Sequence, residues 1–282
     1  MARIHILANT PSDDSTLSGG SWALPLTNML NQQPTKVARS TSDAGTSTRF
    51  VANLGGPKSI SMFAFVANNM TGDASIRLRV SASPLGTSPT IDVTLDAFDT
   101  NVVFGSEPWG VFPWSGYRED DQPGGPITLY KHPTSELGQY VLVDIDDTAN
   151  PDGYVQIGRF LAGDPFVPTY NFALGAQLAF VDESRQSRSQ GGQLYSDVKP
   201  KRRRFSCDFD FMSKAEAYGA AYDLQRRLGI TGNLLMVYDP DDGADVRLRR
   251  TIYGTMTALN PIVTANNTDH PYTWQFSMEE ML

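Results

Sequence analysis

The last third of the chain, residues 201–282, constrains the fold more than any other part, because two hydrophobic periods follow one another there. The first is the alternation of apolar and polar residues that a half-buried strand requires. The second is a helical period, which predicts a helix over 214–228. Together they predict a β–α–β–β–β unit that presents sheets. Its strands are expected at 205–211, 234–238, 245–259 and 272–278, and the apolar residues of the first strand are Phe205, Cys207, Phe209 and Phe211.

The predicted helix is specified at both of its ends. Ser213 can cap the N-terminus while the carboxylate of Glu216 reaches back to the cap, which is the arrangement of a capping box. Gly229 supplies the left-handed turn that ends many helices. We expect the apolar face to pack on the sheet, and this face carries Ala217, Tyr218, Ala221, Leu224 and Leu228.

The first 168 residues show a different pattern, in which short apolar or alternating segments are separated by long polar loops. No convincing helical period occurs there, and this combination is typical of a β-sandwich or jelly roll. Segment 163–172 is interrupted by Gly163, Pro165 and Pro168. We therefore expect a mostly β protein with two domains, an N-terminal jelly roll over 1–168 and a β-sandwich with one helix over 169–282.

The composition restricts the class of protein and of partner. With 40% apolar and 19% charged residues, the chain is in the globular range. The formal net charge of −8 argues against general nucleic-acid binding, which needs a positive surface. The longest apolar run, 62–67, is far too short to span a membrane, and residues 1–9 lack the pattern of a signal peptide. We expect folding in a cytosol, with neither a membrane nor a specific nucleic acid as partner.

The sequence contains a single cysteine, Cys207. An intramolecular disulfide is therefore excluded. Because Cys207 lies on the apolar face of its predicted strand, we expect a buried, unreactive thiol.

Recognisable catalytic motifs are missing from the sequence. The histidines His5, His132 and His270 are far apart, and none lies in a ligand-spaced pair. No glycine–x–serine–x–glycine elbow occurs, and the glycines of 55–57 lack the lysine and helix of a phosphate-binding loop. Paired carboxylates for glycoside hydrolysis stay open, because such pairing is spatial and 31 acidic residues are present. We expect neither enzymatic activity nor a cofactor.

Four aromatic residues gather in a loop-like segment of the first domain, and they form the candidate binding surface. Aromatic rings stack on the apolar faces of sugars and also anchor protein interfaces. Three interpretations stay open: a loop that closes one end of its own sandwich, a protein contact, and a sugar site. The four residues are Trp109, Phe112, Trp114 and Tyr117.

Acidic residues cluster in two segments, 144–152 and 239–245. Carboxylate and amide oxygens of this kind can hold calcium, but the spacing of 144–152 does not fit an EF-hand loop. Both segments serve well as turns between strands. We therefore favour turns and expect no metal.

A basic run precedes the strand at 205–211, and we take it as a candidate subunit interface. Basic residues that enter a strand form a solvated face or a protected sheet edge in most proteins. Because the second domain is nearly neutral overall, a contact with an acidic neighbouring subunit is favoured over DNA. The candidate residues are Lys201, Arg202, Arg203 and Arg204.

Two regions resemble proteins of tailed phages. The first resembles the galactose-binding-like jelly-roll modules of their structural proteins, through residues 21–30, 50–57, 68–69, 144–153 and 157–159. The second, residues 175–282, is similar to the sandwich-plus-helix domain shared by tail-tube, distal-tail and baseplate hub proteins. Its strand at 202–211, helix at 215–228, turn at Asp239–Pro240 and final strand carry this similarity. The order of the two domains is the reverse of that in distal-tail proteins, or the first strand joins the second domain with the jelly roll inserted.

The resemblance implies a structural protein of a phage tail tip or baseplate, assembled in the host bacterial cytoplasm and carried in the virion. Its second domain would form a homo-oligomeric ring, and its jelly roll would decorate that ring. Other tail and baseplate proteins and a host surface glycan are the partners this implies. The main alternative is a carbohydrate-binding adhesin that recognises a receptor. A third is an accessory domain of a polysaccharide hydrolase.

Overall fold

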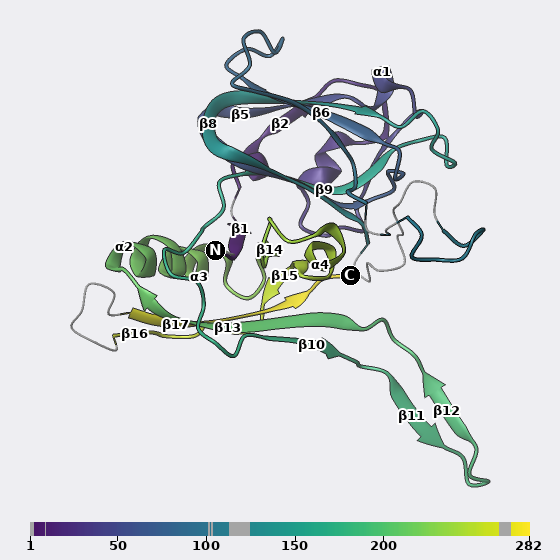
Figure 1. Cartoon of the computed structure of the whole chain (residues 1–282), viewed down its shortest axis with the longest axis vertical. Helices are drawn as coiled ribbons and strands as arrows, with labels where there is room; N and C mark the ends of the chain where they lie inside the picture. The colour runs from purple at the N-terminus through teal and green to yellow at the C-terminus, as the bar shows by residue number, and fades with distance from the viewer. Residues whose placement is uncertain (1–2, 9, 101, 103, 113–124, 265–271) are drawn as a thin grey trace. The chain divides into compact units, whose positions relative to one another are not determined.

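The computed structural model describes residues 3–8, 10–100, 102, 104–112, 125–264 and 272–282 (Figure 1). The chain divides into two compact units. The first comprises Met1–Val167 with Leu234–Thr251, and the second comprises Pro168–Asn233 with Ile252–Leu282. The expected mostly β fold with antiparallel sandwich sheets is confirmed. The domain boundary expected between residues 168 and 169 stays a prediction.

The first unit contains an eight-stranded antiparallel sheet that folds into a sandwich. Its strand order is β3-β4-β9-β5-β8-β6-β7, and β2 pairs with β5. The strands are β2 (Thr16–Ser18), β3 (Trp22–Leu24), β4 (Ala38–Ser40), β5 (Phe50–Asn68), β6 (Ser75–Ser81), β7 (Ile91–Asp96), β8 (Ile127–Asp146) and β9 (Gln156–Gly163). Short helical turns connect them, at Pro11–Asp14, Leu26–Leu30 and α1 (Gly45–Thr48).

Strand β8 is long and curved, and it pairs with different neighbours along its length (Figure 1). It pairs with β5 at residues 127–131, 136–138 and 140–143, and residues 140–146 also pair with β6. The register between β5 and β8 shifts between Asn53 and Lys58 and again between Ile60 and Met62. Irregularities of this kind bend a strand and increase its twist, so β8 can curve around the apolar core.

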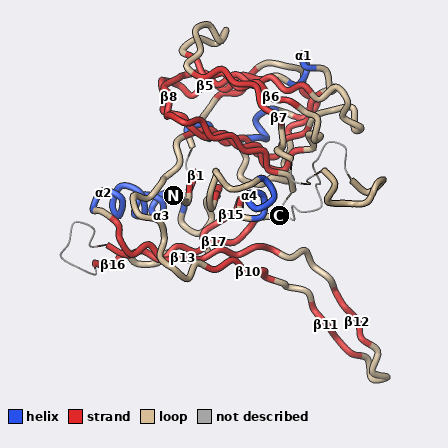
Figure 2. The backbone as a smooth tube through the Cα atoms, viewed as in Figure 1, coloured by secondary structure: helices blue, strands red, loops and turns tan. Residues whose placement is uncertain are grey.

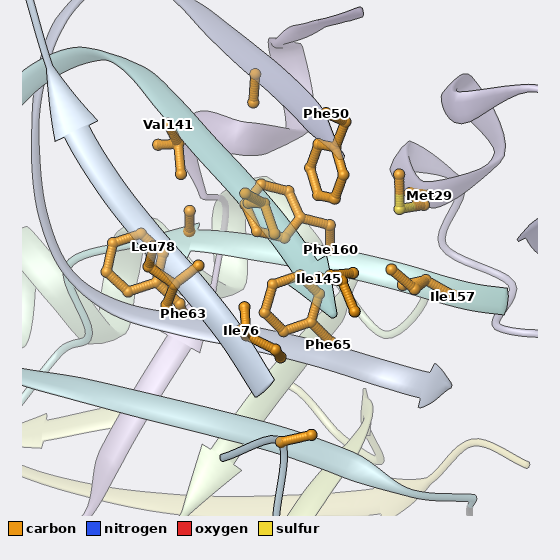
Figure 3. Packing of buried hydrophobic residues seen from close by; sticks show 14 of the residues in the cluster. Met29, Phe50, Phe63, Phe65, Ile76, Leu78, Val141, Ile145, Ile157 and Phe160 are labelled. Carbon is orange, nitrogen blue, oxygen red and sulfur yellow. The ribbon is translucent and has the colours of Figure 1, made fainter. Parts of the chain in front are cut away.

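Aromatic rings from separate strands fill that core (Figure 3). The ring centroid of Phe160 lies 5.3 Å from those of both Phe50 and Phe65. Strand β6 alternates between buried and more exposed residues, and its apolar residues Ile76 and Leu78 are fully buried. Burial of apolar area of this kind is the main force that holds a sandwich together.

The first unit also includes residues from the C-terminal part of the chain. Strand β1 (His5–Ala8) pairs antiparallel with β14 (Asn233–Val237). Next along the chain comes the short helix α4 (Ala244–Arg249). The strand expected over 245–259 is therefore wrong in its first half, and β15 begins only at Thr251.

Local sequence explains why a helix replaces the first half of that strand. The segment carries the good helix formers Ala244 and Leu248. Arg247 and Arg249 lie in its last turn, where their positive charges stabilise the helix by interacting with the negative end of its dipole. Residues 245–249 alternate in polarity, but five residues are too few to distinguish the period of a strand from that of a helix.

The second unit is an antiparallel sheet with the order β15-β17-β13-β10, and β16 pairs with β17. The strands are β10 (Gln177–Val181), β13 (Arg202–Met212), β15 (Thr251–Met256), β16 (Ile262–Thr264) and β17 (Tyr272–Glu280). The helix expected over 214–228 is confirmed as α2 (Lys214–Glu216), a π-helical turn (Ala217–Ala221) and α3 (Tyr222–Leu228). Its capping box forms as expected, since Glu216 N donates to Ser213 Oγ at 3.3 Å and Ser213 N to Glu216 Oε2 at 2.8 Å.

One face of this sheet is buried, and its residues face each other across β13 and β17. Cys207 lies opposite Phe276, and the rings of Phe209 and Trp274 stack with their centroids 5.7 Å apart. The expected burial of Cys207 is confirmed, and burial raises the pKa of its thiol. The thiol therefore stays protonated and unreactive at neutral pH.

Two aromatic residues expected on the buried side are exposed instead. Phe211 is 60% exposed, because the register shifts between Phe209 and Met212 and brings Met212 inward. Tyr218 is 50% exposed and lies in the π-helical turn, whose extra residue rotates the helix face.

The second unit also carries a two-stranded hairpin, formed by β11 (Arg185–Arg188) and β12 (Leu194–Asp197). Figure 2 shows that it projects beyond the end of β10 and β13. Across the described residues, no helix is long and apolar enough to cross a membrane.

Candidate binding cleft

A cleft of about 530 Å³ opens in the first unit. Three segments line it: residues 95–99 at the end of β7, residues 127–133 at the start of β8, and residues 240–251 around α4. We call it the β7–β8 cleft. Its wall combines apolar and charged side chains, namely Phe98, Leu129, Tyr130, Leu248, Asp96, Asp99, Lys131, Asp241 and Arg247.

The sandwich positions the aromatic part of the wall. Strand β8 carries Tyr130, whose ring stacks on Phe63 of β5 with centroids 6.2 Å apart and planes 25° apart. The hydroxyl of Tyr130 lies 3.0 Å from Nδ1 of His132. Burial raises the pKa of Tyr130, so the hydroxyl is protonated and can donate or accept a hydrogen bond at neutral pH. The ring is therefore fixed in orientation, with only part of its surface open.

Helix α4 supplies the opposite side of the cleft. Leu248 packs against the hydrophobic core of the sandwich. Arg247 forms an ion pair with Asp99, and its Nη1 donates to the carbonyl of Pro240 at 3.3 Å. Burial lowers the pKa of Arg247 from its usual value, but an arginine remains charged at neutral pH. Arg247 is thus occupied in holding the wall together.

Three charged groups of the wall are open to a ligand. Lys131 is half-buried, while Asp96 and Asp241 are exposed, and none of the three forms an ion pair within the described part of the chain. His5 lies close by: burial is the largest cause that lowers its pKa, Lys131 lowers it further and Asp241 raises it. The cleft thus offers two carboxylate acceptors and one ammonium donor beside a fixed aromatic ring.

The aromatic candidate surface lies partly within the described residues. Trp109 is 84% exposed. Phe112 is half-buried, and its ring meets that of Phe104 edge-on at 5.4 Å. Trp114 and Tyr117 lie outside the described residues. Neither Trp109 nor Phe112 lines the β7–β8 cleft, so the cleft and this surface are separate candidates.

The basic candidate residues form ion pairs inside the second unit. Arg203 is 4% exposed and donates from Nε to Glu280 Oε1 at 3.0 Å. Arg204 reaches Glu279 at 2.5 Å, and Arg202 reaches the same carboxylate at 3.0 Å. Lys201 is exposed. In the sequence, this pairing is indicated by the acidic residues at the end of β17. Residues of opposite charge that face each other on neighbouring antiparallel strands form favourable pairs.

The acidic segment 144–152 forms a turn whose carboxylates are largely used within the protein. Asp147 is buried and accepts hydrogen bonds from the Thr71 hydroxyl at 2.5 Å and from Asn150 Nδ2 at 2.7 Å. Asp144 pairs with Arg79 at 2.5 Å. Among the residues that the structure describes, no three His, Cys, Asp or Glu side chains gather as a metal site requires.

Sequence reasoning did not find the β7–β8 cleft, because its three segments are separated by long stretches of chain. The only local signal was the pair of carboxylates that flanks each turn, at 96–99 and at 239–242. Such pairs are common in turns. Tyr130 and Lys131 reach the wall of the cleft because β8 is curved, and no local sequence pattern predicts that curvature.

No family model matches the chain, and no curated protein matches it significantly. Several solved structures resemble it weakly. A carbohydrate-binding module from a family 31 glycoside hydrolase of Clostridium perfringens is 10% identical, with 55% of this chain and 97% of that chain covered and a TM-score of 0.37. A family 32 module of NanJ from C. perfringens, in complex with galactose, is 10% identical, with 56% and 98% covered and a TM-score of 0.36. A fucolectin from the serum of Morone saxatilis is 8% identical, with 97% of each chain covered and a TM-score of 0.37. These scores are too low to carry an argument about family or function.

Proposed function

We propose that this chain is a non-catalytic binding protein whose first unit holds a carbohydrate in the β7–β8 cleft. The observation that carries the proposal is the placement of open carboxylates and an ammonium group beside a fixed aromatic ring. Asp96 and Asp241 supply the carboxylates, Lys131 the ammonium group and Tyr130 the ring.

The chemistry of these groups fits a saccharide. A sugar hydroxyl both donates and accepts hydrogen bonds, so it can donate to a carboxylate while it accepts from an ammonium group. The apolar face of a pyranose ring packs on an aromatic side chain. The volume of about 530 Å³ lies in the range of small-molecule sites. With two open carboxylates against one open cation, the wall favours a neutral sugar over an acidic one.

A glycan array probed with the labelled full-length protein tests this proposal. We expect binding to a restricted set of neutral glycans, which the free sugar competes away. Asp96→Asn and Lys131→Ala should each weaken binding by about tenfold, since each removes the charge that strengthens a hydrogen bond to the sugar. No binding to any glycan would contradict the proposal.

Matched variants distinguish the cleft from the aromatic surface. Trp109→Ala and Trp114→Ala alter the surface and leave the cleft residues unchanged. If they abolish binding while Asp96→Asn does not, the sugar site lies on that surface and the cleft is not the site. Circular dichroism of each variant checks that the fold is retained.

A second candidate function is structural: a homo-oligomeric component of a tail tip or baseplate, carried in the virion. The resemblance of the sequence to tail-tube and distal-tail proteins supports it. The specific observation in its favour is the hairpin β11–β12, all of whose strand residues are exposed. The two functions are compatible, because the β7–β8 cleft and the hairpin belong to different units.

A further inference from the structure

The hairpin β11–β12 is not covered by other described parts of its own chain. All eight strand residues are exposed, and the two strands pair only with each other within the described sheets. Leu194 and Tyr195 are about half exposed, at 49% and 55%. A two-stranded hairpin without a packed face is marginally stable in water. Its apolar side chains therefore favour a partner that covers them.

The two faces of the hairpin differ in charge. Arg188 lies directly opposite Leu194, so a cation and an apolar side chain share one face. On the other face Arg185 lies opposite Asp197, so that face carries one formal charge of each sign. We call the first the Arg188 face. It carries a positive charge and no carboxylate, so it fits an acidic surface with an apolar rim.

The same unit carries such a surface. A recess of about 280 Å³ is lined by two carboxylates, Asp208 and Asp210, and by apolar groups that include Pro261 and Val263. Both aspartates are exposed on β13 and form no ion pair within the described residues. Val263 is 49% exposed. We call this the β13 recess. It complements the Arg188 face in charge and in apolar character.

The hairpin cannot reach the β13 recess of its own chain. Strand β10 ends with Val181 opposite Arg202, and the hairpin continues from that end of the sheet, away from the helix (Figure 1). Asp208 lies six residues further along β13 from Arg202, roughly 20 Å in the other direction at about 3.3 Å per residue. A hairpin that occupies the recess must therefore come from another molecule.

We propose that the Arg188 face of one copy docks in the β13 recess of a second copy of this chain. Arg188 then lies against Asp208 and Asp210, and Leu194 lies against Pro261 and Val263. Because the two surfaces lie at opposite ends of the unit, the contact is heterologous and generates a ring if the rotation closes. This inference rests on the proposed oligomerisation and names its interface.

Analytical ultracentrifugation of the full-length protein over a range of concentrations tests this interface. We expect the wild-type protein to associate. Arg188→Glu should raise the dissociation constant by about tenfold or more, because it places like charges together. Combining Arg188→Glu with Asp208→Lys should restore much of the association. Arg185→Gln on the opposite face is the control, because it removes a charge without placing two carboxylates opposite each other, and it should associate as the wild type does.

The outcomes separate the interface from oligomerisation itself. If the wild-type protein associates and Arg188→Glu changes nothing, or if Arg185→Gln is equally harmful, the interface is overturned while oligomerisation stands. A wild-type protein that stays monomeric at every concentration overturns both. Restoration by the charge swap, with unchanged circular dichroism, supports the contact directly.

Discussion

Neighbouring arginines on β13 have different roles although the sequence presents them as one basic run. Arg203 and Glu280 are both buried, with side chains 4% and 2% exposed, whereas the Arg204 side chain is 50% exposed. The alternation of a strand separates them, because consecutive side chains point to opposite faces. Arg203 thus belongs to the interior, and of the run only Lys201, Arg202 and Arg204 remain accessible as interface candidates.

Stability measurements on these two arginines test this distinction. Arg203→Ala leaves Glu280 buried without a partner, so the free energy of unfolding should fall by about 3–5 kcal/mol. Arg204→Ala breaks an exposed pair and should cost no more than about 1 kcal/mol. Urea unfolding monitored by circular dichroism measures both. Similar losses in the two variants would mean that Arg203 is not buried.

The buried His5 predicts a pH dependence of stability. Its pKa is lowered in the folded state, chiefly by burial, whereas the unfolded value is about 6.5. Above that pH both states are neutral and the contribution of His5 is intact. As the pH falls, the unfolded state takes up the proton first, so stability decreases. Between pH 8 and pH 5, Tm should therefore fall less in His5→Gln than in the wild type. Equal slopes would contradict this.

At the scale of elements, the helix over 214–228 was predicted almost residue for residue. Its signals are local: a capping box at Ser213, an apolar face and Gly229 at its end. The bulge after Phe209 and the π-helical turn at 217–221 were not predictable, because each inserts a residue that only packing against neighbours selects. Helix α4 was missed because its alternation imitates a strand.

Two substitutions on consecutive helix residues test how the helix is held. Leu224 is buried, with 9% of its surface exposed, so Leu224→Ala should destabilise by about 2–5 kcal/mol. Among the described residues, Asp223 pairs at the surface with Arg226 at 3.2 Å and with Arg227 at 3.7 Å. Asp223→Ala should therefore change stability by about 0.5 kcal/mol or less. Thermal and urea unfolding measure both effects. Equal effects would mean that Leu224 and Asp223 do not lie on a buried and an exposed face of the helix.

At the scale of the whole molecule, the sequence separates a helix-poor acidic region from a nearly neutral one, and the structure forms two units. The sequence did not show that residues 234–251 belong with the first unit, because that membership depends on contacts between distant segments. The same reason hid the β7–β8 cleft.

Limited proteolysis followed by mass spectrometry tests this organisation. We expect the first cuts at residues 163–175 or at 184–192 in the exposed hairpin, since proteases need accessible chain. Strand β13 should resist, because its interior residues are buried. An initial cut between Phe205 and Phe211 would contradict the two-domain prediction.

The central claim is that carbohydrate occupies the β7–β8 cleft, and backbone NMR of the labelled protein, titrated with the best array glycan, tests it most directly. The predicted result is shift changes that map to residues 95–99, 127–131 and 240–248, and that in Asp96→Asn need about tenfold more glycan to reach the same size. Saturable changes confined to residues 104–112, or no changes at any concentration, would contradict the claim.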